Sequence, residues 1–303
     1  MCTKCADVRG QMKSTVSADM IVLRTPTEMR KWSQSRAAET ASVGFVPTMG
    51  ALHDGHMQLI ALSQSNNEFT VLSIFVNPTQ FNNPSDFDKY PRTFDSDLSL
   101  AENAGVDVVY APTPLLMYPD GFDTSIDPGL ISRSMEGEFR PGHFQGVATV
   151  VVKLLNAVQP TRLYLGQKDY QQLAVLRHVV TDLDLAVEVV GAPTVRDTDG
   201  LALSSRNVRL TAKHRELAPI IFVALTTALK AFQNGERSAI ALRTAVLDVL
   251  SSEPECTIEY VSVVDAVNLS PIEELINPCV ICVAVHFGDV RLIDNIQLEL
   301  QSR

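Results

Sequence analysis

Short apolar segments alternate with helical stretches over residues 21–190, and this alternation limits the possible folds more than any other feature of the sequence. We expect strands at 21–23, 42–46, 69–76, 106–110, 162–165 and 187–190, and helices after Thr25 and at 56–66, 94–104, 144–157 and 168–181. Strands that alternate with helices favour right-handed crossovers and a mostly parallel sheet. The sequence therefore predicts an α/β fold built on a Rossmann-like parallel sheet.

Local signals mark several element boundaries. Thr25 and Glu28 match a capping box, which predicts that a helix begins there. Gly105 stands where a helix commonly ends in a left-handed residue. The stretches at 77–91 and 111–142 are rich in proline, asparagine and glycine, so we expect them to be irregular.

The character of the sequence changes after residue 194. Helical segments at 212–233 and 237–250 precede strands near 257–264 and 280–286, which indicates a smaller α+β domain. We therefore expect three parts, listed here with their bounds: a flexible N-terminal tail at 1–19, a Rossmann-like domain at 20–194 and a C-terminal α+β domain at 195–303.

Composition excludes some classes of partner. The 303-residue chain has a formal net charge of -10, which argues against a broad surface for DNA or RNA. We expect no apolar run long enough to span a bilayer, and the N-terminus lacks the apolar core of a secretory signal. Cys2 and Cys5 form a Cys-x-x-Cys pair with no further ligands nearby, so reduced thiols are favoured over a metal site. These features predict a cytoplasmic protein with no nucleic-acid and no membrane partner.

The most informative motif lies between a strand and a helix and reads Pro47-Thr48-Met49-Gly50-Ala51-Leu52-His53-Asp54-Gly55-His56. Ligands of open α/β sheets bind at such carboxyl ends of strands. Gly50 and Gly55 allow the backbone to approach a phosphate, and the N–H groups of the following helix point to the same place. His53 and His56 can donate hydrogen bonds to phosphoryl oxygens. Two ordinary loop histidines are the alternative, but these coinciding features favour a phosphate site.

Two further motifs follow later strands. In Gly166-Gln167-Lys168-Asp169, the lysine could neutralise a phosphate, and the aspartate could cap the helix or hold a ribose or a metal. The segment 199–207 contains Ser204, Ser205 and Arg206, which suit a mobile clamp for a triphosphate. Either motif alone could be a polar turn. Together with His-x-Gly-His, the serine–serine–arginine loop resembles the nucleotidylyltransferase superfamily.

At two other places, the residues alone allow two interpretations of the polar side chains. Gln80 follows the central strand, and its amide can donate and accept at once, as a hydroxy acid or amino acid substrate requires. Loop capping by Asn77 and Gln80 is an equally good interpretation of the residues alone. Arg140 and His143 precede the apolar helix and either face the pocket or tether a loop, and we favour the tether.

These motifs, with Tyr90-Pro91-Arg92-Thr93, Gly166 to Gln172 and Arg291 to Asn295, resemble the pantothenate synthetase (pantoate–β-alanine ligase) family over roughly residues 20–300. The resemblance implies a homodimer in which the domain at 20–194 binds nucleotide and pantoate and the domain at 195–303 is a lid. It also implies that ATP, as its Mg²⁺ complex, converts pantoate to pantoyl adenylate and pyrophosphate. β-Alanine then releases AMP and forms pantothenate.

The resemblance assigns roles to single residues. His56 would be the catalytic proton donor, Gln80 would contact pantoate and β-alanine, and Gln172 would be a second contact to pantoate. The residues that would bind ATP are Met49, Gly50, Ala51, Leu52, His53, Asp54, Gly55, His56, Gly166, Gln167, Lys168, Asp169, Val195, Leu203, Ser204, Ser205 and Arg206. The loop at 203–206 should move when ATP binds, because water must be kept from the adenylate.

Some positions limit or depart from this resemblance. Thr79 stands where we expect methionine in many relatives, which should reshape the pocket floor without abolishing activity. Asp95 and Asp97 could approach a magnesium ion, but carboxylates at a helix N-terminus are the favoured interpretation, so the metal ligands stay unknown. The alternatives are another adenylate-forming nucleotidylyltransferase with a different small carboxylate, or a non-catalytic nucleotide-binding protein. The second predicts broken motifs, whereas the groups that the chemistry needs are present.

Overall fold

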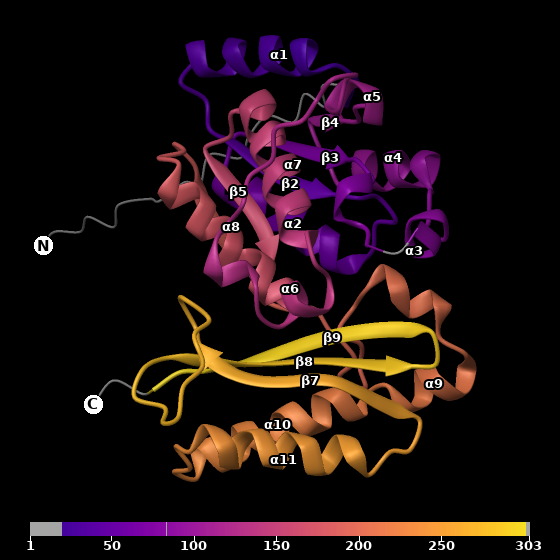
Figure 1. Cartoon of the computed structure of the whole chain (residues 1–303). Coiled ribbons are helices and arrows are strands. Elements are labelled where there is room, and N and C mark those ends of the chain that lie inside the picture. The colour runs from indigo at the N-terminus through magenta and orange to yellow at the C-terminus, as the bar shows by residue number, and fades with distance from the viewer. Residues whose placement is uncertain (1–19, 83, 301–303) are drawn as a thin grey trace, which may run out of the picture.

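The computed structural model describes residues 20–82 and 84–300, so the expected tail at 1–19 with its two cysteines lies outside the described residues. Figure 1 shows a larger domain above and a smaller domain below. The main elements of the larger domain are β1 (Ile21–Leu23), α1 (Pro26–Ala38), β2 (Val43–Thr48), α2 (Asp54–Asn66), β3 (Phe69–Ile74), α4 (Phe94–Asn103), β4 (Val108–Tyr110), α7 (His143–Val158), β5 (Arg162–Gly166), α8 (Tyr170–Asp182) and β6 (Glu188–Ala192).

The larger domain is built on a six-stranded parallel sheet in the order β1-β4-β3-β2-β5-β6. From β2, the chain proceeds through β3 to β4 on one side, and then returns to β5 and β6 on the other side. The strand order therefore reverses between β2 and β5, and such a reversal opens a crevice at the carboxyl ends of the strands. This topology confirms the predicted Rossmann-like fold.

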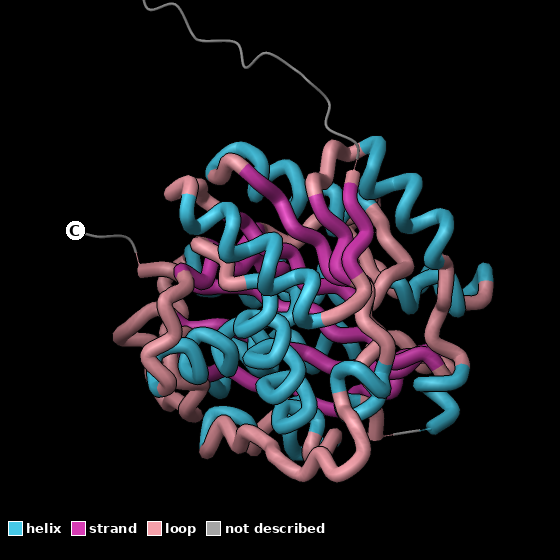
Figure 2. The backbone as a smooth tube through the Cα atoms, turned by 90° about the horizontal axis from the view of Figure 1, so that it is seen from above, coloured by secondary structure: helices cyan, strands magenta, loops and turns pink. Residues whose placement is uncertain are grey.

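Helices cover both faces of the parallel sheet, as Figure 2 shows from above. Residues of α1, α7 and α8 share one buried cluster with Phe45 of β2. Residues of α2 and α4 share another cluster with the adjacent Val46. Neighbouring residues of a strand point to opposite faces, and both of these are 0% exposed, so β2 is buried on both faces of the sheet.

Most element boundaries lie close to those predicted. The capping box of Thr25 and Glu28 is present at the start of α1, and Gly105 has a φ of +74° after α4. α2 begins at Asp54, two residues earlier than expected, because His53 acts as its N-cap. The two stretches expected to be irregular contain short helices: η1 (Pro78–Gln80), α3 (Pro84–Asp88), α5 (Pro114–Met117), η2 (Leu130–Ser132) and α6 (Glu136–Phe139), and a further one, η3 (Gln167–Asp169), precedes α8.

The smaller domain has an antiparallel sheet in the order β7-β8-β9. Its elements are η4 (Ser205–Arg209), α9 (Ala212–Leu217), α10 (Ile220–Gln233), α11 (Ala239–Ser251), β7 (Cys256–Asp265), β8 (Cys279–Phe287) and β9 (Val290–Leu298). The sheet packs on α10 and α11 with one face and turns the other toward the larger domain (Figure 1). The predicted helix at 212–233 is wrong as one element, because it divides at Pro219, and β9 was not predicted.

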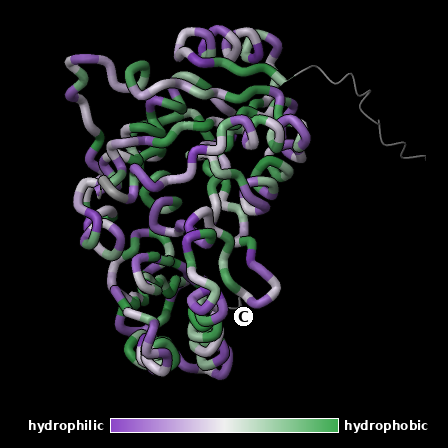
Figure 3. Tube along the Cα trace, turned by 90° about the vertical axis from the view of Figure 1, so that its right-hand side faces the viewer, coloured by the Kyte–Doolittle hydropathy of each residue, from purple (hydrophilic) through white to green (hydrophobic). Residues whose placement is uncertain are grey.

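The helical stretch Ala212–Gln233 qualifies by length and composition as a membrane span, with a mean hydropathy of 1.3. That differs from the expectation that no apolar run would be long enough. Ala224, Leu225 and Ala228 are 0% exposed in the core of the smaller domain, so packing accounts for part of this hydropathy. Figure 3 shows hydrophobic segments inside both domains.

The two domains meet through an apolar cluster and an ionic network. Tyr170 and Ala174 of α8 pack with Val280 and Cys282 of β8. Beside them, Arg291 of β9 reaches across the boundary between the domains to a carboxylate of α6. The boundary at 194/195 itself stays a prediction.

Candidate active site

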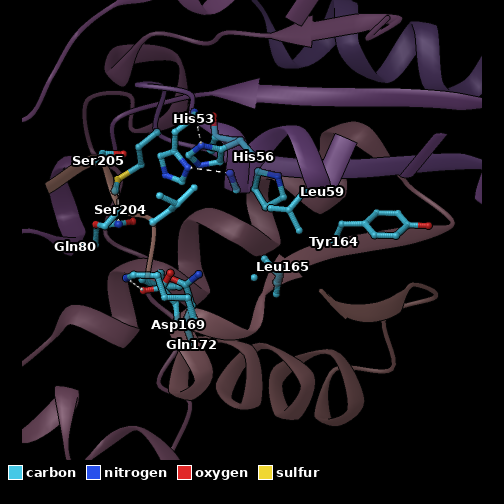
Figure 4. Close-up of a pocket in the computed structure, with 18 of the residues that line it drawn as sticks. His53, His56, Leu59, Gln80, Tyr164, Leu165, Asp169, Gln172, Ser204 and Ser205 are labelled. Carbon is cyan, nitrogen blue, oxygen red and sulfur yellow. Dashed lines mark hydrogen bonds and ion pairs between the residues drawn. The ribbon is translucent and has the colours of Figure 1, made fainter. Parts of the chain in front are cut away.

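A cavity of about 240 Å³ opens at the carboxyl ends of β2, β3, β5 and β6, at the point where the strand order reverses. Figure 4 shows the two histidine rings on one side and Asp169 and Gln172 on the other. Most of the site residues predicted from the sequence line this cavity: Met49, His53, Gly55, His56, Gln80, Gly166, Lys168, Asp169, Gln172, Val195, Leu203, Ser204, Ser205 and Arg206. Segments far apart in the sequence therefore converge at one place.

The remaining predicted ATP contacts do not line the cavity: Gly50, Ala51, Leu52, Asp54 and Gln167. Three of them, Gly50, Ala51 and Leu52, belong to the loop between β2 and α2. This loop packs on Asp97, which is 2% exposed in the first turn of α4. The carboxylate of Asp97 accepts the N–H groups of Ala51 at 2.9 Å and Leu52 at 2.8 Å. Asp97 thus holds the loop between β2 and α2 in shape.

His53 and His56 form an unusual cap at the start of α2. The N–H of Gly55 donates to Nδ1 of His53 at 3.1 Å, and the N–H of His53 donates to Nδ1 of His56 at 3.3 Å. Because each Nδ1 accepts a backbone proton, each neutral ring carries its own proton on Nε2. The capping geometry therefore fixes the tautomer of both rings, and their centroids lie 4.1 Å apart.

Both rings are held in the neutral form. Burial, and then the neighbouring His53, lower the pKa of His56 to about 3. Burial and the charge of Lys168 also lower the pKa of His53. Near pH 7 the site therefore presents two neutral rings, each with an N–H group that can donate to an anion. A bound polyanion would raise the pKa of both rings and so favour their charged forms.

Gln80 is held by two other segments and by Asn77 of its own loop. Its backbone carbonyl contacts Nδ1 of His143 at 2.9 Å and accepts from Arg140 at 3.3 Å. Its side-chain oxygen accepts from Asn77 at 3.1 Å, and its side-chain nitrogen lies 3.2 Å from the sulfur of Met49. Arg140 and His143 line the cavity and also tether the loop of Gln80, so both interpretations of these residues hold.

Gly146 lets α7 lie directly against this loop. A Cβ atom at Gly146 would come within 2.5 Å of the carbonyl oxygen of Thr79 and 2.9 Å of the backbone nitrogen of Gln80. We expect Gly146→Ala to displace the loop of Gln80. A misplaced binding group should raise KM for the substrate that the sequence resemblance assigns to Gln80 by about tenfold. Steady-state kinetics would check this, and an unchanged KM in a folded variant would contradict it.

His143 makes stability depend on pH. It is 6% exposed, and burial followed by the charge of Arg140 lowers its pKa to about 4, from a usual 6.5. Below pH 6.5 the unfolded chain takes up a proton that the folded chain refuses until about pH 4, so stability falls as the pH falls. Between pH 6.5 and 5 we expect this residue to cost about 1.5 kcal/mol. Urea unfolding at both pH values should give a smaller loss for His143→Gln, and equal losses would disprove the assignment.

The carboxyl end of β5 is fixed by the smaller domain. Asn295 of β9 donates its side-chain N–H groups to the carbonyls of Gln167 and Lys168, each at 2.9 Å. This leaves the side chains of Lys168 and Asp169 at the cavity, 3.8 Å apart at their charged atoms. Gln167 thus helps to fix the end of β5 through its backbone carbonyl, and it does not line the cavity.

Val195 and residues 203–206 form a further wall of the cavity. The two ends of this segment meet through the N–H of Leu203, which donates to the carbonyl of Val195 at 2.9 Å. The hydroxyl of Ser205 donates to the carbonyl of Ala51 at 3.3 Å, so the wall touches the loop before α2. Tyr90 is buried beside Ser205 and also lines the cavity.

Several lining residues were not predicted as site residues from the sequence. Asn77, Tyr90 and Thr194 line the cavity, and only their place after a strand or beside a motif could have indicated them. Thr79 does not line it, although we expected it to reshape the floor. Its hydroxyl instead donates to Asn77 at 3.0 Å, so any effect of Thr79 on the cavity is indirect.

No group of three or more potential metal-ligating side chains occurs in residues 20–82 and 84–300. Asp97, considered above as a magnesium contact, has both carboxylate oxygens in hydrogen bonds to backbone N–H groups. The carboxylate at the cavity with room for a further partner is that of Asp169, which is 50% exposed.

Comparison with known proteins gives one consistent result. The family model for pantoate–β-alanine ligase matches residues 21–297. The pantothenate synthetase of Acetivibrio thermocellus is 45% identical over 281 residues, which are 93% of this chain and 100% of that protein. That of Aquifex aeolicus is 47% identical over 269 residues, covering 88% of this chain and 95% of the relative.

Solved structures agree with the sequence comparison. The crystal structure of pantothenate synthetase from Thermus thermophilus has a TM-score of 0.86 and 43% identity, and the match covers 93% of this chain and 100% of that one. The pantoate–β-alanine ligase of Francisella tularensis, complexed with β-γ ATP and β-alanine, has a TM-score of 0.73 and 36% identity, covering 91% and 97%.

Proposed function

The chain belongs to the pantoate–β-alanine ligase family, and we infer that the cavity at the carboxyl ends of β2, β3, β5 and β6 is where it joins pantoate to β-alanine with ATP. One observation carries this location. Phosphate-binding, amide and cationic side chains from separate segments, including His56, Gln80, Lys168 and Arg206, line a single cavity at the switch point of the sheet.

The reaction runs in two steps that need no covalent bond to the protein. A carboxylate oxygen of pantoate attacks the α-phosphorus of ATP, and the bond from that phosphorus to the bridging oxygen breaks as pyrophosphate leaves. The amine of β-alanine then attacks the acyl carbon of pantoyl adenylate, loses a proton, and expels AMP. Both steps build negative charge on phosphate oxygens, so positioning and charge stabilisation are the main tasks of the protein.

The histidine pair suits the first of these tasks. His53 and His56 are neutral, with Nε2–H free to donate because each Nδ1 is already occupied. A donor fixed by a backbone hydrogen bond costs no reorganisation when charge develops on the phosphate. Lys168 and Arg206 add full positive charges at the cavity. We assign these four side chains to the triphosphate.

The pantoate end of the cavity is more apolar. Val147, Val150 and Leu154 of α7 line it, and they could contact the two methyl groups of pantoate. Gln80 and Gln172 are the nearby amides that could bind its hydroxyl and carboxylate groups. This combination favours a branched hydroxy acid over a purely polar carboxylate.

Three further properties are part of the proposal. ATP would enter as its Mg²⁺ complex, which typically binds through phosphates and one or two carboxylates, and Asp169 is placed to contribute one. A homodimer and a cytoplasmic location are proposed from the family resemblance. Each can be checked, by light scattering of the purified chain and by cell fractionation.

The test of the function is release of AMP and pyrophosphate from ATP, with pantoate and β-alanine added singly and together. AMP release that requires both substrates supports the amide-forming reaction. If neither substrate elicits AMP while ATP still binds, the substrate assignment fails, and other small carboxylates should be screened against the same site.

The wall at 203–206 should become more protected when ATP binds. In the structure it is joined to the loop before α2 by the hydrogen bond from Ser205 to Ala51. Contacts from Ser204, Ser205 and Arg206 to a triphosphate would add to that bond and exclude water from the adenylate. Limited proteolysis with and without ATP would measure this, and unchanged cleavage of the segment would count against it.

A further inference from the structure

A second cavity of about 370 Å³ adjoins the first and lies between the two domains. It shares five lining residues with the cavity described above, so a ligand could extend from one into the other: Arg140, Lys168, Asp169, Ser204 and Arg206. Arg209 lines the second cavity and does not line the first. The lining of the second cavity has both cationic and acidic side chains, so a phosphate chain could bind there only through cations that exchange their carboxylate partners for phosphate oxygens.

Two arginines of η4 converge on one carboxylate at this cavity. Arg206 and Arg209 are three residues apart, and residues with this spacing in a 3₁₀ helix lie on the same side. Nη2 of Arg206 donates to one oxygen of Asp86 at 3.1 Å, and Nη1 of Arg209 donates to the other at 2.9 Å. Arg209 also reaches Asp289 at 3.4 Å. One carboxylate thus occupies donors on two guanidinium groups.

In this arrangement the Asp86 carboxylate occupies donors of Arg206 and Arg209 that could also bind a phosphate group. Planar guanidinium groups bind carboxylate and phosphate oxygens with the same donors. Burial would raise the pKa of Asp86, but the charges and hydrogen bonds of Arg206 and Arg209 hold it below its usual value, so the carboxylate is ionised. The Asp86 side chain is 26% exposed and those of the arginines are 29% and 22% exposed, so water weakens these pairs and a more highly charged ligand can displace them.

We propose that Arg209 is a third phosphate-binding cation, beside Lys168 and Arg206, and that Asp86 occupies Arg206 and Arg209 until the β- and γ-phosphates of ATP displace it. The proposal rests on the ATP-dependent function given above. When the α-phosphorus is attacked, pyrophosphate remains between the two arginines. The return of Asp86 to the arginines then competes with the product and favours its release.

The proposal predicts opposite effects for the two sides of the ion pair. Asp86→Asn keeps the shape of the side chain but removes the competing charge, so pyrophosphate should bind several-fold tighter. Arg209→Gln removes a charge-assisted hydrogen bond, so pyrophosphate should bind about tenfold more weakly. Arg215→Gln is the matched control, because Arg215 also pairs with two aspartates and lines neither cavity.

The experiment is calorimetric titration of the full chain with magnesium pyrophosphate, with the circular dichroism melt of each variant as a check on folding. If Asp86 and Arg209 only anchor α3, both substitutions should weaken binding, and that result overturns the proposal. It is also overturned if either variant binds as the wild type does, or if the wild type binds no pyrophosphate at millimolar concentration. Failure of the wild type to form AMP from pantoate and β-alanine would instead refute the proposed function, because the pyrophosphate titrations need neither substrate.

Discussion

Replacing His56 by alanine should lower kcat for AMP formation by about 10²- to 10³-fold, the usual effect of removing one preorganised donor from a developing charge. The ring is locked by the backbone N–H of His53 and is neutral, with its pKa lowered to about 3 by burial and by the neighbouring ring. Its Nε2–H is therefore a fixed donor, which the proposed function directs at the phosphates of ATP. Steady-state assays of AMP release with pantoate and β-alanine would measure the loss.

A second variant separates hydrogen bonding from proton donation. His56→Gln keeps an N–H donor but cannot give up a proton, so it should recover part of the activity if donation of a hydrogen bond is the main role. No recovery would favour proton transfer, which requires bound ATP to raise the pKa of His56 from about 3.

His178→Ala is the control for these variants. That ring lies on α8, pairs with Asp182 at 3.2 Å and lines neither cavity, so its removal should leave the rate unchanged. A loss smaller than tenfold for His56→Ala would contradict the role given to that ring.

The fold could be predicted from local patterns because its sheet is parallel. Residues of β2 such as Phe45 and Val46 are buried on opposite faces, and a strand buried in this way reads as a short, mainly apolar segment that is easy to recognise. β9 was missed because its apolar residues are interrupted by Arg291, Asp294 and Asn295. Their partners, which include Glu136, Arg196 and Gln167, lie far away in the chain. A single sequence does not identify such partners.

The candidate site was predictable to the same degree and for a related reason. The carboxyl ends of parallel strands meet at one edge, so motifs that follow strands can be expected to converge there. The role of Asp97 could not be predicted, because its carboxylate oxygens accept hydrogen bonds from the N–H groups of Ala51 and Leu52, which are 46 and 45 residues away in the chain. The same holds for the contact of Arg140 with Gln80, which depends on packing between distant segments.

The second large effect should come from Arg291, which links β9 to the larger domain. Its guanidinium donates two hydrogen bonds to Glu136, at 2.7 and 2.6 Å, and another to Glu259 at 2.9 Å. Glu136 is 5% exposed, and its other partners are Tyr260 at 2.9 Å and Arg140 at 3.4 Å. Arg291→Met removes the strongest partner of a buried charge, which should cost about 3–5 kcal/mol of unfolding free energy.

Two comparisons test the cause of that loss. Lys213→Met breaks an ion pair whose lysine is 68% exposed, and should leave the unfolding free energy almost unchanged because water screens such a pair. The double variant Glu136→Leu/Arg291→Met removes both buried charges, so it should be more stable than Arg291→Met alone. Urea unfolding of the four proteins would measure these differences. A double variant that is no more stable than Arg291→Met would show that the unpaired charge of Glu136 is not the source of the loss.

The pH dependence of stability should show whether the charge of Glu136 stabilises the folded protein. Burial would raise the pKa of Glu136, but the hydrogen bonds and charge of Arg291 lower it to about 2, from a usual 4.5. The wild type therefore has this stabilisation above pH 4.5 and loses it as the pH falls toward 2. In Arg291→Met the carboxyl can be protonated at higher pH, so the stability difference between the two proteins should shrink on acidification.

Because Arg140 contacts both Glu136 and the carbonyl of Gln80, the same substitution should raise KM for pantoate, which links the docking of the smaller domain to the substrate site.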